Sequence, residues 1–120
     1  MVDDSAAVRD AICHFIDRAT PFTACCQAGD GVAAVEKAKE RAPALVILDL
    51  SMPRMNGVET ASVLRGMLPG TKIVGFTTFD EEFRGSLLAT TAFDVILSKH
   101  EGLAKLTEVV SALLPALNPK

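Results

Sequence analysis

The chain has 120 residues, of which 49% are hydrophobic and 22% charged, and its formal net charge is −3. This length suits one domain, and the hydrophobic content excludes an intrinsically disordered chain. The acidic balance, with no Trp and no Tyr, argues against direct nucleic-acid binding by this chain. No apolar stretch reaches the roughly 18 residues that span a bilayer, and no signal peptide is evident. We therefore expect a cytoplasmic protein without a membrane partner.

Helical and extended patterns alternate along the chain. Residues 5–18 carry apolar side chains at helical spacing, and residues 22–27 predict a short strand. This alternation is typical of βαβ units and predicts an α/β fold around a parallel sheet. Further helices are predicted over residues 32–41, 56–68 and 101–114 and from residue 80 onward, and further strands over residues 44–48, 73–76 and 95–98.

Asp49 ends an unbroken aliphatic run, residues 44–48, which is typical of a strand buried on both faces of a parallel sheet. Two later strands end in the same way, in Thr77 and in Lys99, and Val2 near the start precedes an acidic pair. The carboxyl ends of parallel strands meet at one edge, where such sheets bind ligands. Five side chains are therefore expected to meet there: Asp3, Asp4, Asp49, Thr77 and Lys99.

This grouping suits phosphoryl chemistry. A lone Asp after a strand is more often a turn-former or a helix cap, so the joint pattern carries the prediction. Clustered carboxylates attract a cation, and oxygen ligands alone suit Mg²⁺. An ionised Asp49 can attack phosphorus and form an aspartyl phosphate, while Lys99 offsets the charge and Thr77 donates a hydrogen bond. Three cysteines without metal-ligand spacing are interpreted as reduced thiols.

One feature conflicts with this plan. Only Met1 and Val2 precede the acidic pair, whereas strands usually need about five residues. Either the chain lacks upstream residues, or its sheet closes without a full first strand, or a neighbouring chain completes it. The sequence leaves these three alternatives open.

The chain resembles the receiver domain (CheY-like) of two-component response regulators over essentially its whole length, residues 1–120. Five segments carry the resemblance in the same order and spacing: Val2-Asp3-Asp4-Ser5, Leu48-Asp49-Leu50-Ser51-Met52-Pro53, Asn56-Gly57, Phe76-Thr77-Thr78 and Ser98-Lys99. The resemblance implies a flavodoxin-like doubly wound parallel sheet, strand order 2-1-3-4-5, with helices on both faces and a first strand that is truncated or missing here.

The resemblance also implies a role for each site residue. Asp49 is the phosphoacceptor, Thr77 is the switch hydroxyl, and Lys99 contacts the phosphoryl group. Asp3, Asp4, Asp49 and the backbone carbonyl of Ser51 hold Mg²⁺. The phosphodonor is a sensor histidine kinase, and the chain is a signalling switch with at most slow autophosphatase activity.

The output implied by the resemblance is less defined. Residues 76–80 and 97–100 look most like receivers of regulators that carry a helix-turn-helix DNA-binding domain, and residues 115–120 resemble the start of a linker. The switching surface is expected to include the fourth helix, with Phe83 and Leu87, the fifth strand and residues 101–114. A homodimer, an attached DNA-binding domain outside this chain and another partner are the open alternatives.

The chain departs from the family pattern at three positions. His100 stands where a proline is usual, Ile96 replaces the aromatic switch residue, and Thr78 replaces a small residue beside the pocket. Ile96, Thr78 and the truncated start support a second hypothesis. A degenerate receiver-like interaction module that does not signal by phosphate is the alternative. A phosphatase of the haloacid dehalogenase type is disfavoured, because its general acid two residues after the nucleophile is replaced by Ser51.

Overall fold

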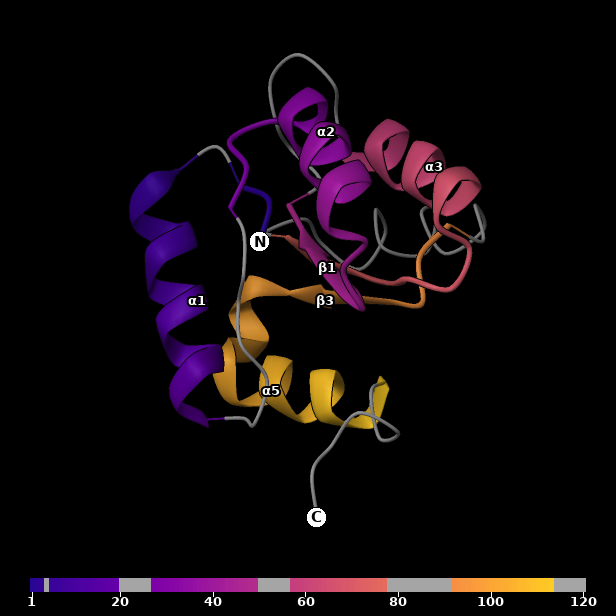
Figure 1. Cartoon of the computed structure of the whole chain (residues 1–120). Coiled ribbons are helices and arrows are strands. Elements are labelled where there is room, and N and C mark those ends of the chain that lie inside the picture. The colour runs from indigo at the N-terminus through magenta and orange to yellow at the C-terminus, as the bar shows by residue number, and fades with distance from the viewer. Residues whose placement is uncertain (4, 20–26, 50–56, 78–91, 114–120) are drawn as a thin grey trace.

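The computed structural model describes residues 1–3, 5–19, 27–49, 57–77 and 92–113 (Figure 1). Residues 22–26 of the strand expected over 22–27, and the helix expected from residue 80 with Phe83 and Leu87, lie outside these ranges. The described elements follow the predicted alternation. They are α1 (Ala6–Ala19), α2 (Gly31–Arg41), β1 (Leu45–Leu48), α3 (Gly57–Met67), β2 (Lys72–Thr77), β3 (Val95–Ser98), the 3-10 turn η1 (Lys99–Glu101) and α5 (Gly102–Leu113).

The three strands form a parallel sheet in the order β1-β2-β3. Leu48 is opposite Gly75, and Thr77 is opposite Ser98, so the strands end close to one another at the same edge. Parallel strands need crossover connections, and the helices between them supply these. The fold is therefore the α/β doubly wound arrangement that the sequence predicts.

The main chain around Val2 occupies the place of a further strand. Val2 forms parallel bridges with Leu48 on one side and with Ala28 on the other. The Val2 N–H donates to the Ile47 carbonyl at 2.8 Å, and the Asp49 N–H donates to the Val2 carbonyl at 2.8 Å. The spatial order Ala28, Val2, β1, β2, β3 corresponds to 2-1-3-4-5. Val2 thus lies in the sheet at the position of the first strand in this order.

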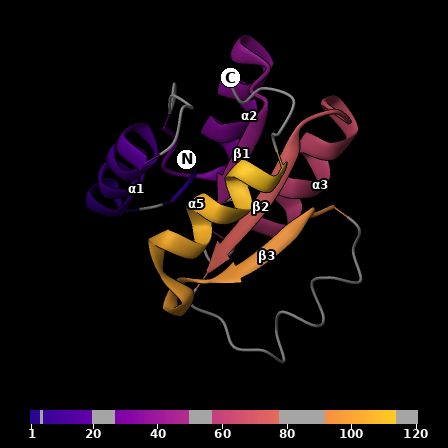
Figure 2. The same ribbon diagram turned by 90° about the horizontal axis from the view of Figure 1, so that it is seen from below.

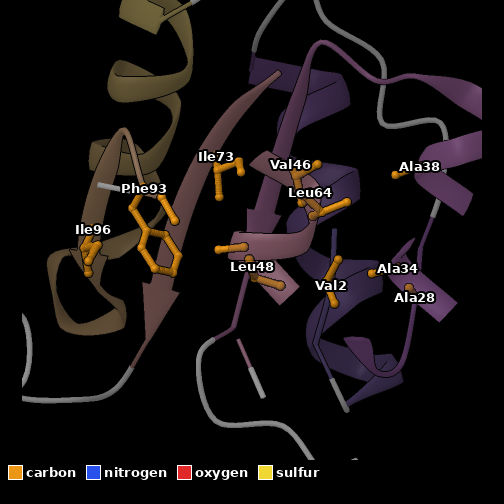
Figure 3. Close-up of a cluster of buried hydrophobic side chains, with 12 residues drawn as sticks. Val2, Ala28, Ala34, Ala38, Val46, Leu48, Leu64, Ile73, Phe93 and Ile96 are labelled. Atoms are coloured by element: carbon orange, nitrogen blue, oxygen red, sulfur yellow. The ribbon is translucent and has the colours of Figure 1, made fainter. Parts of the chain in front are cut away.

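Helices cover both faces of the sheet. In Figures 1 and 2, α2 and α3 lie on one face, and α1 and α5 lie on the other. Alternate residues of each strand point into the two resulting cores. Val46, Leu48 and Ile73 pack toward α2 and α3, as Figure 3 shows, whereas Ile47 and Val74 pack toward α1 and α5. The prediction that residues 44–48 form a strand buried on both faces is confirmed for β1.

Side chains at the starts of two helices satisfy main-chain donors there. The Ser5 hydroxyl accepts from the Val8 N–H at 3.3 Å, and the Asp30 carboxylate accepts from the Ala33 N–H at 2.9 Å. Each contact caps backbone N–H groups that have no partner within the helix. At the other end of α2, the capping residue Ala42 adopts the left-handed conformation at φ 44°. These caps explain why α1 and α2 begin where they do.

Cys13 is buried on α1, as expected of a structural thiol. Burial raises the pKa of its thiol, so it stays protonated at neutral pH. Cys25 and Cys26 lie outside the described residues. Among the residues described, no helix combines the length and the apolarity that crossing a bilayer requires.

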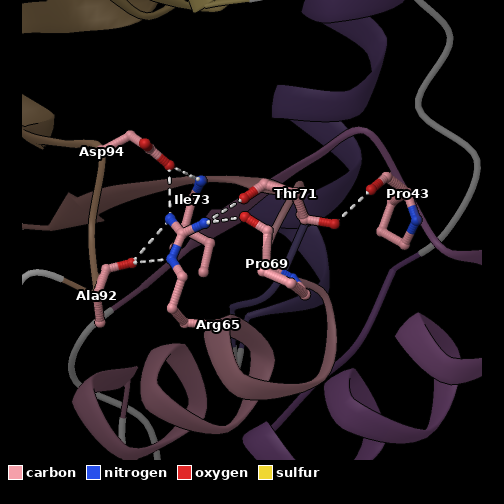
Figure 4. A network of polar contacts seen from close by, with 7 residues as sticks. All are labelled: Pro43, Arg65, Pro69, Thr71, Ile73, Ala92 and Asp94. Atoms are coloured by element: carbon pink, nitrogen blue, oxygen red, sulfur yellow. Dashed lines mark hydrogen bonds and ion pairs between the residues drawn. The ribbon is translucent and has the colours of Figure 1, made fainter.

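Arg65 of α3 cross-links the edge of the sheet at which β2 and β3 begin, here called the amino edge (Figure 4). Its guanidinium donates to the carbonyls of Ala92, Pro69 and Thr71, and it forms a 2.7 Å ion pair with Asp94. The same Asp94 oxygen accepts from the Ile73 N–H at 2.7 Å, while the Thr71 hydroxyl donates to the Pro43 carbonyl. One planar side chain therefore joins α3 to the starts of β2 and β3.

We predict that Arg65→Met lowers the free energy of unfolding by about 1–2 kcal/mol, because it removes a partly exposed guanidinium group together with its several hydrogen bonds. Urea denaturation measures the change. The control is Arg41→Met on the exposed side of α2, which should change the free energy by much less. Equal effects of the two substitutions would show that the contacts of Arg65 do not stabilise the fold.

Candidate functional site

Two carboxylates lie at the carboxyl edge of the sheet. Asp49 directly follows β1, and Asp3 directly follows the bridged residue Val2. The residues are only 6% and 1% exposed, although neither side chain is apolar. Buried carboxylates must be hydrogen-bonded or paired to stay ionised. This requirement makes their contacts informative.

Every polar atom of Asp3 has a partner. Its N–H donates to the Ala28 carbonyl at 3.1 Å, and its carbonyl accepts from the Arg9 guanidinium at 2.8 Å. Its carboxylate accepts from the Ser5 N–H at 2.9 Å with one oxygen and from the Lys99 ammonium at 2.8 Å with the other. Asp3 is therefore held in one orientation from four directions.

Lys99 lies in η1, directly after β3, and its ammonium group is the positive charge that faces the two carboxylates. Its Nζ lies 2.8 Å from Asp3 Oδ2 and 3.7 Å from Asp49 Oδ2. The turn that carries it is fixed locally: the Glu101 carboxylate accepts from the Ser98 N–H at 2.9 Å. Gly102 follows at φ 87°, a left-handed conformation that favours glycine, and turns the chain into α5. The ammonium thus sits between two carboxylates while its side chain stays 23% exposed.

The structure brings together three of the predicted site residues: Asp3, Asp49 and Lys99. Thr77 ends β2 opposite Ser98, so its main chain is at the predicted edge, but its side chain is not described. Asp4 and Ser51 lie outside the described residues, as does Thr78. Their assigned roles remain predictions.

Two contributors to this edge were not predicted. Arg9 of α1 reaches the main chain of Asp3, and its Nε donates to the Gln27 side chain at 3.2 Å. Gln27 in turn donates to Asp10 at 3.0 Å. The sequence offers little that would have predicted Arg9. It shows only a long cationic side chain near the start of the helix that follows the acidic pair. Nothing in the sequence marks Gln27.

The donor set fits a hard divalent cation. Within the described ranges no cluster of three His, Cys, Asp or Glu residues could hold a metal ion. The two buried carboxylates of Asp3 and Asp49 nevertheless offer oxygen ligands that meet at Lys99. Mg²⁺ binds through one or two carboxylates and keeps several waters, so these two residues meet its minimal demand. Soft or imidazole-preferring metals find no matching ligand among these contacts.

Comparisons with known proteins identify the family of this chain. The family model described as the response regulator receiver domain matches residues 1–111. The chain is 39% identical over 82 residues to the uncharacterized transcriptional regulatory protein YxjL of Bacillus subtilis, an alignment that covers 68% of this chain and 38% of that protein. This chain therefore aligns with less than two-fifths of the curated regulator.

Solved structures show the same fold. A DNA-binding response regulator of the LuxR family from Staphylococcus aureus superposes with a TM-score of 0.86 at 24% identity, covering 93% of both chains. The receiver domain of AraT, a response regulator from Geobacillus stearothermophilus, superposes with a TM-score of 0.82 at 30% identity, covering 97% of this chain and 91% of that one. By its sequence match, its fold and its carboxyl-edge residues, the chain belongs to the response regulator receiver domain family, a family of signal-transduction modules.

Proposed function

We propose that the chain is a phosphoacceptor switch in which Asp49 receives a phosphoryl group. The observation that supports this most directly is the placement of one buried carboxylate, Asp49, beside an ammonium group that already pairs with a second carboxylate. A nucleophilic oxygen, a cation to offset the incoming charge and a neighbouring metal ligand are the parts that phosphoryl transfer to aspartate needs.

The proposed donor is a phosphohistidine of a sensor histidine kinase. A carboxylate oxygen of Asp49 forms a bond to phosphorus while the phosphorus–nitrogen bond breaks, and the electron pair of that bond stays on the imidazole. Mg²⁺, when bound by Asp3 and Asp49 with Asp4 and the Ser51 carbonyl, would neutralise charge on the phosphoryl oxygens. Slow hydrolysis of the aspartyl phosphate resets the switch, and no further enzymatic activity is proposed.

The distances from Lys99 to the two carboxylates support a role for its side chain in switching. It is nearer to Asp3 than to Asp49, at 2.8 Å against 3.7 Å. Phosphorylation replaces the single charge of Asp49 by about −1.5 to −2 on the phosphoryl group. That change strengthens the pull on the ammonium from the side of Asp49, and the Thr77 hydroxyl is proposed to move toward the same group. Because β3, η1 and α5 follow one another in sequence, a shift of Lys99 can be transmitted to α5.

The output is proposed to be regulation of transcription through a DNA-binding domain attached to the receiver, or through a dimer of receivers. The support is the similarity to YxjL, named as a transcriptional regulatory protein, and to a structure named as a DNA-binding response regulator. This chain itself is not proposed to contact DNA.

A second candidate function rests on Ile96. Its side chain is 4% exposed and belongs to the same core cluster as Phe93 and Ile73 (Figure 3). Because Ile96 is aliphatic and buried, β3 has no aromatic side chain at this position that could change its orientation when Asp49 is phosphorylated. A receiver-like module that binds its partner without regard to phosphate is therefore the alternative.

Phosphorylation is tested by incubation with acetyl phosphate and Mg²⁺ followed by intact-protein mass spectrometry. We expect the wild type to gain one phosphoryl group, because Asp49 supplies the nucleophile, and Asp49→Asn to gain none. Asp17→Asn, an exposed change on α1, is the matched control and should be labelled like the wild type. Labelling of Asp49→Asn to the same extent would reject the assignment.

A second prediction concerns Lys99. Lys99→Met removes the ammonium that competes with a metal ion for Asp3, so Mg²⁺ should bind about fivefold more tightly, the equivalent of roughly 1 kcal/mol for unit charges 4 Å apart in water. Isothermal titration calorimetry measures this affinity. Lys105→Met, on the exposed side of α5, controls for net charge and should leave the affinity nearly unchanged. Weaker Mg²⁺ binding by Lys99→Met would show that the ammonium and the metal do not compete.

The two candidate functions differ in what phosphorylation does to the rest of the chain. If the chain is a switch, amide chemical shifts in β3 and α5 change when Asp49 is phosphorylated, because Lys99 lies at their junction. If it is a phosphate-independent module, labelling leaves residues 95–98 and 102–113 unshifted. Nitrogen–hydrogen correlation spectra before and after addition of acetyl phosphate decide between them, with Asp49→Asn as the blank.

A further inference from the structure

We propose that Arg9 is a positioning residue for the acidic edge: it holds the main chain of Asp3 and thereby sets the affinity of the proposed Mg²⁺ site. Arg9 Nη1 donates to the Asp3 carbonyl at 2.8 Å. The inference rests on the proposed function, because the metal site at Asp3 is part of that proposal. It assigns a role to a side chain that belongs to neither the metal-ligand set nor the phosphoryl-contacting set.

The contact lies directly beside the bridged residue Val2, where Asp3 leaves the sheet. Val2 is bridged on both sides, and among the described residues two hydrogen bonds of 3.1 Å join residues 1–3 to Ala28. The Asp3 carbonyl lies where the next hydrogen bond of this pairing would form. The guanidinium of Arg9 occupies this position. A side chain therefore extends the support of the strand by one hydrogen bond, immediately behind the carboxylate.

Arg9 is itself braced, so it can act as a fixed support. Its Nε donates to the Gln27 side chain, which also donates to Asp10 one residue along α1. A Cβ at Gly29 would lie 3.4 Å from Nη1, so the guanidinium packs directly over that glycine. The planar fork of an arginine can satisfy the Asp3 carbonyl and Gln27 at once, whereas a lysine ammonium offers a single nitrogen.

The test compares Arg9→Met with Arg18→Met, an equal loss of charge at an exposed position on the same helix. Mg²⁺ affinity is measured by calorimetry, and the rate of labelling by acetyl phosphate is measured as a function of Mg²⁺ concentration. We expect Arg9→Met to weaken Mg²⁺ binding about tenfold, as loss of an outer-shell support does, while the rate at saturating Mg²⁺ is retained. Arg9→Lys should fall in between, and Arg18→Met should match the wild type.

The direction of the effect separates positioning from simple electrostatics. Loss of a positive charge near a cation site strengthens cation binding if charge alone acts, so tighter or unchanged Mg²⁺ binding by Arg9→Met would overturn the proposal. If Arg9→Met does not fold, Gln27→Leu provides the test. It removes the contact at Arg9 Nε, together with the Gln27–Asp10 hydrogen bond, and leaves the guanidinium in place, so it should weaken Mg²⁺ binding by a smaller factor.

A measurement without metal distinguishes failure of this inference from failure of the proposed function. In the Mg²⁺-free protein, amide hydrogen exchange at Asp3 and Ser5 should be faster in Arg9→Met than in Arg18→Met, since both N–H groups depend on the position of Asp3. Failure of the wild type to bind Mg²⁺, with this difference in exchange preserved, would reject the metal site while leaving the support of Asp3 intact. Equal exchange rates in the two variants would reject Arg9 as a support.

Discussion

The ion pair between Asp3 and Lys99 is the interaction on which the carboxyl edge depends. Asp3 is 1% exposed, and an ionised carboxylate without compensation is too costly to bury. Lys99 compensates for it from 96 positions further along the chain, at 2.8 Å. The pair can form only if the residue after Val2 and the turn after β3 meet across β1 and β2. The parallel order of the sheet is therefore a condition of the site as well as of the core.

The two edges of the sheet use their cations differently. At the amino edge, Arg65 donates to three main-chain carbonyls and to Asp94, and the carbonyls can shift only if the main chain around the strands moves. At the carboxyl edge, Lys99 is a point charge on a flexible stem between two carboxylates at unequal distances. One edge is thus suited to stability and the other to a change of partner.

The sequence predicted most of the carboxyl edge, because strand ends are readable from apolar runs and parallel strands align their ends. Asp49, Lys99 and Asp3 were placed together on that argument alone. Arg65 and Arg9 were not predicted, since each acts through carbonyl groups whose positions depend on the folded chain, and an arginine on a helix gives no sign of which carbonyls it will reach. The single bridged residue at Val2 was left open, because pairing on both sides of so short a segment cannot be derived from its length.

Contacts from several elements hold Asp3 where it follows the bridged residue Val2. The Ser5 N–H and the Lys99 ammonium contact its carboxylate, the Arg9 guanidinium contacts its carbonyl, and its own N–H donates to the Ala28 carbonyl. Side-chain contacts are individually weak and are lost one at a time, whereas a ladder is cooperative. The geometry of the proposed metal-binding carboxylate is therefore open to adjustment by single substitutions that leave the hydrophobic cores untouched.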